Sequence, residues 1–168
     1  MDELEDNMSK GIMRIYFGEG QGKSTAALGI AISEVGHGKS ATVISFLREK
    51  KESNEELLKR LEPELKFFRF EKSQISFHKL SEEEKKEEIM NLRNGFNYSK
   101  KVITTGGCDL VVLDEILELV ENEIISENEF LELAAAIPED MVVICTGRNL
   151  KNSIRNCADE VYQIILEK

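Results

Sequence analysis

The sequence contains no tryptophan, only two histidines and only three cysteines. Cys108, Cys145 and Cys157 lie far apart and form no C-x-x-C pair, which predicts buried reduced thiols. His37 and His78 have no partners at metal-ligand spacing, so we expect both at the surface or in loops. These scarcities exclude a disulfide scaffold and a histidine-based metal site.

Long apolar runs and an excess of basic residues are also missing. No run approaches the ~18 apolar residues of a membrane-spanning helix. The first ten residues, "MDELEDNMSK", have neither the basic start nor the apolar stretch of a signal peptide. We therefore expect a cytoplasmic protein, with no membrane partner and a mobile acidic arm at residues 1–10. The formal net charge of −10 argues against nucleic acid as a partner, because binding its phosphates requires a basic face.

The remaining chain has the composition of one soluble globular domain, which we place at residues 11–168. Of its 168 residues 41% are hydrophobic and 32% are charged. Strands are expected at 12–17, 41–47, 65–70, 109–115, 141–146 and 160–166. Helices are expected at 24–36, 54–61 and 150–158, and after two S-x-x-E capping boxes that begin at Ser81 and Ser126. This alternation predicts an α/β fold with a mostly parallel central sheet of about six strands and helices on both faces.

The stretch "YFGEGQGKSTAALG" (16–29) follows the first expected strand and opens the first expected helix. Its glycines leave backbone amides open to phosphate oxygens, and the start of the helix adds a positive dipole end. Lys23 supplies a cation and Ser24 a hydroxyl suited to Mg²⁺. The pattern G-x-x-x-x-G-K-[ST] is incomplete, because Phe17 stands where its first glycine is expected. The residues assigned to nucleotide binding are Gly18, Glu19, Gly20, Gln21, Gly22, Lys23, Ser24, Thr25 and Arg148.

Two further motifs are expected at the same edge of the sheet. The strand "DLVVLDE" ends in Asp114 and Glu115, which with Ser24 are the candidate Mg²⁺ ligands. Arg148 follows the next strand and is suited to a triphosphate or a substrate carboxylate. Lys23 and Glu115 are the candidate catalytic residues. An Asp-Glu pair also occurs in ATPases, so these motifs leave hydrolysis and group transfer both open.

Together these stretches resemble the ATP:corrinoid adenosyltransferases of the cob(I)alamin adenosyltransferase type. The family's loop reads roughly G-[ND]-G-K-G-K-T-T-A-A-L-G, which also lacks the earlier glycine. The match continues through "VGHGKSATVISF" (35–46), "DLVVLDEI" (109–116) and "VVICTGRNLKNSIRNCADEV" (142–161). The resemblance implies a single-domain, RecA-like P-loop fold that transfers the 5′-deoxyadenosyl group of ATP to Co(I) of a reduced corrinoid, releasing triphosphate. It implies ATP, Mg²⁺ and a corrinoid as ligands, a reductase or flavoprotein as electron donor, and a homodimer.

The resemblance also implies that ATP lies reversed along the loop and that apolar side chains displace the lower axial ligand of the cobalt. Phe46, Phe70 and Phe77 are the candidates for that displacement. The chain departs from the family at residues 45–49, where S-F-L-R-E replaces Q-F-I-K-G, and residues 50–104 carry no matching motif. The alternatives are a RecA-like ATPase, a small-molecule kinase and a nucleotide-binding protein without corrinoid activity.

Overall fold

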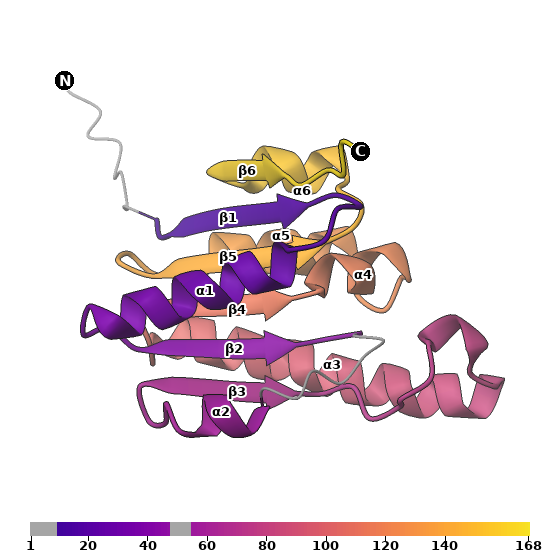
Figure 1. Ribbon diagram of the computed structural model, residues 1–168. Helices are drawn as coiled ribbons and strands as arrows, with labels where there is room; N and C mark the ends of the chain where they lie inside the picture. The colour runs from indigo at the N-terminus through magenta and orange to yellow at the C-terminus, as the bar shows by residue number, and fades with distance from the viewer. Residues whose placement is uncertain (1–9, 48–54) are drawn as a thin grey trace.

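The computed structural model describes residues 10–47 and 55–168. All but Lys10 of the expected acidic arm lies outside these residues. The described residues form a six-stranded sheet of order β3-β2-β4-β5-β1-β6 (Figure 1). Every pairing between neighbours is parallel, which confirms the expected sheet. The strands are β1 (Ile12–Phe17), β2 (Ala41–Ser45), β3 (Leu65–Arg69), β4 (Leu110–Asp114), β5 (Val142–Gly147) and β6 (Glu160–Gln163).

Helices cover both faces of the sheet (Figure 1). One face carries α1 (Lys23–Gly36) and α2 (Glu55–Lys59). The other carries α3 (Glu82–Thr105), α4 (Ile116–Glu121), α5 (Glu127–Ala135) and α6 (Asn152–Cys157). A short 3₁₀ helix, η1 (Phe77–Lys79), precedes α3. None of the helices in the described part of the chain combines the length and apolarity that a membrane crossing needs.

The core explains why the central strands read as continuous apolar runs. In β4, Val111 and Leu113 pack toward α3–α6, whereas Leu110 and Val112 pack toward α1 and α2. A strand that is covered on both faces needs apolar side chains at every position. Cys145 is buried in this core, and burial raises the pKa of all three free thiols. All three cysteines are free thiols, as expected, but Cys108 and Cys157 are half-buried where burial was expected.

Both predicted capping boxes are confirmed, at the starts of α3 and α5. In the second box, the carboxylate of Glu129 also accepts a hydrogen bond from Arg93 Nη2 at 2.7 Å. Arg93 donates a further bond to the carbonyl of Ile124, also at 2.7 Å. Arg93 and the Ser126 amide together lower the pKa of Glu129 from 4.5 to about 2. This contact joins α3 to the start of α5.

We expect Glu129→Gln to lower the free energy of unfolding by about 1–2 kcal/mol near neutral pH, allowing for the partial exposure of the pair. Because the folded-state pKa of Glu129 is depressed, its stabilisation is full above the ordinary value and disappears as pH falls through about 2. The difference between wild type and variant should therefore shrink between roughly pH 5 and pH 2. Urea unfolding at a series of pH values measures it, with exposed Glu132→Gln on the same helix as control. A difference in unfolding free energy between wild type and Glu129→Gln that does not depend on pH would contradict an electrostatic origin of this stabilisation.

Candidate functional site

The predicted site residues gather at the carboxyl edge of the sheet. Since all six strands are parallel, the loop after β1 and the ends of β4 and β5 meet at this edge (Figure 1). The strand β5 lies between β1 and β4. Residues 146–148 therefore lie between the glycine-rich loop and the acidic end of β4. This order explains how the three motifs of the sequence form one site.

The first half of the glycine-rich loop is held by neighbouring backbone. The amide of Gly18 donates to the carbonyls of Gly147 and Arg148 at 3.2 and 3.1 Å, and that of Gly20 donates to the Ile164 carbonyl at 3.1 Å. Gly18 has a φ of 124°, and a Cβ there would lie 2.2 Å from the Ile164 oxygen. A side chain is therefore excluded at this position. In this conformation, the amides of Gly18 and Gly20 both donate to backbone carbonyls of the chain itself.

The second half of the loop forms the N-terminus of α1. Gly22 is its N-cap with a φ of 108°, makes no side-chain cap, and no acidic residue follows in the first turn. The amides of Lys23, Ser24 and Thr25 lack carbonyl partners within the helix because of their position in its first turn. The Lys23 ammonium lies over the loop and donates to the Gly20 carbonyl at 2.8 Å. Positive charge and amide donors are thus concentrated at one point.

The acidic end of β4 is organised by Thr146 of β5. Its hydroxyl donates to the carboxylate of Asp114 at 2.7 Å and accepts the amide of Glu115 at 2.8 Å. Asp114 is buried with 4% of its surface exposed. Glu115 has a φ of 66°, which non-glycine residues rarely adopt. The Thr146 bond stabilises this conformation, which turns the Glu115 side chain away from the strand.

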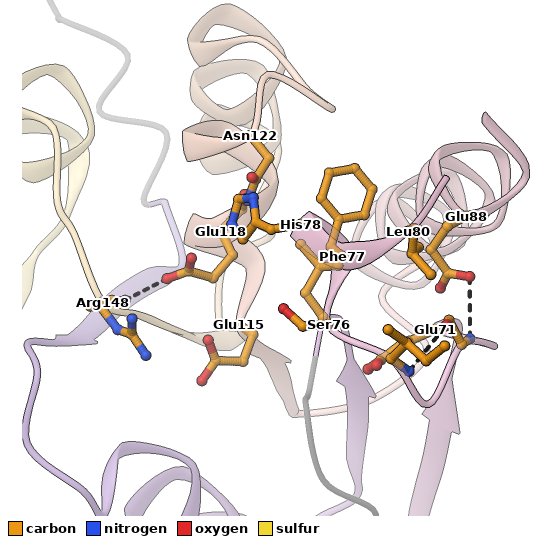
Figure 2. A pocket seen from close by; sticks show the side chains of 13 residues that line it. Glu71, Ser76, Phe77, His78, Leu80, Glu88, Glu115, Glu118, Asn122 and Arg148 are labelled. Atoms are coloured by element: carbon orange, nitrogen blue, oxygen red, sulfur yellow. Dashed lines mark hydrogen bonds between the residues drawn. The ribbon is translucent and has the colours of Figure 1, made fainter. Parts of the chain in front are cut away.

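A pocket of about 260 Å³ opens beside these acids. One wall comes from the ends of β4 and β5 with α4, and the other from the segment at residues 71–80, which joins β3 to α3 (Figure 2). The exposed Arg148 guanidinium and the Glu115 carboxylate extend into the same space (Figure 2). The backbone amide of Arg148 donates to Glu118 at 2.9 Å. The lining residues are Leu47, Glu71, Ser73, Ile75, Ser76, Phe77, His78, Leu80, Glu88, Glu115, Glu118, Asn122 and Arg148.

The three phenylalanine candidates occupy different places. Phe46 is fully buried in the core. Phe70 packs against Gly95, where a Cβ would lie 2.7 Å from Phe70 Cγ and 2.9 Å from Phe46 Cε1. Phe77 lines the pocket, beside the exposed His78. Phe46 is therefore a core residue, Phe70 is a half-buried residue that packs against the core, and Phe77 is the candidate that reaches the site.

Four residues that shape this site, among those that the sequence did not predict, are Thr146, Ile75, Glu118 and Glu88. Thr146 has no role assigned from the sequence, where it is only one position of the matching 142–161 stretch. Ile75 is 52% exposed, and an apolar residue in a polar segment could have indicated it. Glu118 and Glu88 carry no such signal, because Glu118 lies outside every predicted element and Glu88 reads as a solvated residue of the helix after Ser81.

Comparison with known proteins identifies the family of the chain. The family model of the ATP:corrinoid adenosyltransferase BtuR/CobO/CobP matches residues 9–168. The chain is 30% identical to the corrinoid adenosyltransferase CobA of Salmonella typhimurium, over 92% of this chain and 76% of that protein. It is 28% identical to the corrinoid adenosyltransferase of Escherichia coli K12 over the same shares.

The fold also has a counterpart among solved structures. The flagellar accessory protein FlaH from Methanocaldococcus jannaschii is similar with a TM-score of 0.55 and 16% identity, covering 91% of this chain and 70% of that one. This likeness confirms the α/β fold alone. The family model and the sequence relatives show the family as well as the fold. The chain belongs to the ATP:corrinoid adenosyltransferase family.

Proposed function

We propose that the carboxyl edge of the sheet holds ATP by its triphosphate while a corrinoid occupies the neighbouring pocket. The electron pair of Co(I) attacks the ribose 5′ carbon, a cobalt–carbon bond forms, the bond from that carbon to the α-phosphate oxygen breaks, and triphosphate leaves. The observation that carries this proposal is one edge where the helix N-terminus and two carboxylates lie with Arg148, which also lines a pocket whose opposite wall presents Ile75 and Phe77. The chain need only hold the carbon in line and stabilise the leaving group.

The triphosphate is assigned to the loop and the start of α1. The amides of Gly18 and Gly20 support the loop by bonding to other backbone, so residues 21–25 form the cradle. The Lys23 ammonium, now on the Gly20 carbonyl, can turn to a phosphate oxygen with little change of backbone. Arg148, exposed at the pocket mouth, is placed to contact the same polyanion. Both cations then oppose charge that grows on the leaving group.

Mg²⁺ is proposed at Ser24, Asp114 and Glu115. Hydroxyl and carboxylate oxygens are donors that this hard cation prefers. Within residues 10–47 and 55–168, no group of three or more His, Cys, Asp or Glu side chains forms a metal cluster. That fits Mg²⁺, which uses one or two carboxylates together with substrate phosphates and waters. When bound, the ion would neutralise triphosphate charge, while Thr146 orients Asp114 and the Glu115 backbone.

The corrinoid is assigned to the pocket wall formed by the 71–80 segment. Phe77 and Ile75 give this wall apolar side chains, and Ile75 is half exposed. The family resemblance implies that such side chains displace the lower cobalt ligand, which eases reduction to Co(I). We assign that role to Phe77 and Ile75.

The resemblance also supports three proposals about the setting of the enzyme. Co(I) formation needs an electron, so we assign a reductase or flavoprotein as donor. We further propose a homodimer and a cytoplasmic location.

One assay tests the proposed reaction. The protein is mixed with ATP, Mg²⁺, a corrinoid and a reductant, and the phosphate products and the visible spectrum are recorded. We expect triphosphate together with the spectrum of a cobalt–carbon bond. ADP with phosphate would indicate an ATPase, ADP with a phosphorylated acceptor a kinase, and no turnover a binding protein; each of these would overturn the proposal.

A further inference from the structure

The 71–80 segment contains little regular structure, yet it forms one wall of the pocket. Its one helical turn in the described residues is η1. Its C-terminal end is fixed, because Leu80 is buried and the capping box of α3 begins directly after it. The contacts at its N-terminal end therefore determine the positions of Ile75 and Phe77.

Glu88 of α3 holds that end. Its Oε1 accepts the amide of Lys72 at 2.9 Å and its Oε2 accepts the amide of Ser73 at 3.3 Å. The residue is 4% exposed. Burying a carboxylate is costly unless hydrogen bonds compensate for lost water, and these two amides provide that compensation. Removing the carboxylate would take away the side-chain acceptor of both amides.

The contact is well placed to control the pocket. It joins consecutive amides two to three residues before Ile75, so it fixes the direction in which the segment leaves β3. With Leu80 anchored at the other end, the residues between are restrained to one path. Glu88 also lies at the pocket margin, on the same wall as Phe77.

We propose that Glu88 is a positioning residue for the corrinoid: its bonds to the Lys72 and Ser73 amides hold the 71–80 segment so that Ile75 and Phe77 face the cobalt. The effect of Glu88 on turnover rests on the proposed function. The anchoring of the 71–80 segment by Glu88 does not. The ATP site lies on the other wall and does not depend on this anchor.

Hydrogen exchange tests the anchor without any ligand. In the wild-type protein, the Lys72 and Ser73 amides should exchange more slowly than that of the exposed Gln74. In Glu88→Gln the NH2 group cannot accept, so one bond is lost, and the remaining bond is no longer charge-assisted. Both amides should therefore exchange faster, by on the order of 10-fold for the one that loses its acceptor. Glu87→Gln is the control, because it makes the same change at the preceding, exposed position of α3. Unprotected amides in the wild type would overturn the proposal even if the variant did not fold.

Kinetics test the consequence for the corrinoid. We expect Glu88→Gln to raise KM for the corrinoid on the order of 10-fold and to reduce the spectral change that marks loss of the lower cobalt ligand, with KM for ATP unchanged. A merely structural role would affect both substrates or neither, and either result would overturn the proposal. If wild-type protein shows no adenosyl transfer, the proposed function fails, while the exchange result still decides whether Glu88 anchors the segment.

Discussion

Replacing Lys23 with alanine should lower kcat/KM by roughly 100-fold or more, which corresponds to ~3 kcal/mol of lost transition-state stabilisation. Lys23 stands in the first turn of α1, where Gly22 supplies no side-chain cap. Its ammonium lies over the loop whose amides we assign to the triphosphate. Charge grows on that group as the bond from the 5′ carbon to oxygen breaks, so this contact strengthens in the transition state.

The fold should survive this change. The hydrogen bond of Lys23 to the Gly20 carbonyl lies within the loop, three residues away, and the loop is also held through the amides of Gly18 and Gly20. Lys101→Ala, at an exposed position of α3, is the matched control and should keep wild-type kinetics. Steady-state assays that separate the KM for ATP from kcat, together with thermal unfolding, measure both effects. A Lys23→Ala protein with wild-type kcat/KM would end the assignment of this loop to the triphosphate.

Local patterns were sufficient to predict the strands and the motifs at their ends. Buried parallel strands need apolar residues at every position, and capping boxes mark helix starts with a few polar residues. Because parallel strands end at one edge, the sequence order alone placed Lys23, Glu115 and Arg148 together. The helix α4 was missed, since in its six residues Ile116, Leu117, Leu119 and Val120 are all buried and leave no amphipathic stripe.

Contacts between distant residues could not be predicted in the same way. The bonds from Glu88 to the Lys72 and Ser73 amides span 16 and 15 residues and depend on where α3 packs. Nothing local distinguishes Glu88 from the solvated glutamates before it. Phe46 and Phe77 likewise look equivalent in the sequence. The neighbours of each, a packed α3 for Phe46 and an open pocket for Phe77, decide their different roles.

Glu115→Gln should shift the Mg²⁺ requirement upward by on the order of 10-fold to 100-fold, with triphosphate still the product. The change removes the charge of a proposed ligand but keeps its size. Thr146 bonds the backbone amide of Glu115, not its side chain, so the left-handed conformation and the start of α4 should be retained. Saturating Mg²⁺ should therefore recover much of the rate.

Titration of the activity with Mg²⁺ checks this expectation, and Glu121→Gln provides the matched control. Glu121 is an exposed residue at the end of α4. The same substitution there therefore measures the effect of a lost carboxylate on the helix, with the proposed metal site unchanged. The two variants should differ in the Mg²⁺ midpoint and agree in thermal stability. A Glu115→Gln midpoint equal to that of wild type would remove Glu115 from the metal site and leave Ser24 and Asp114 as its protein ligands.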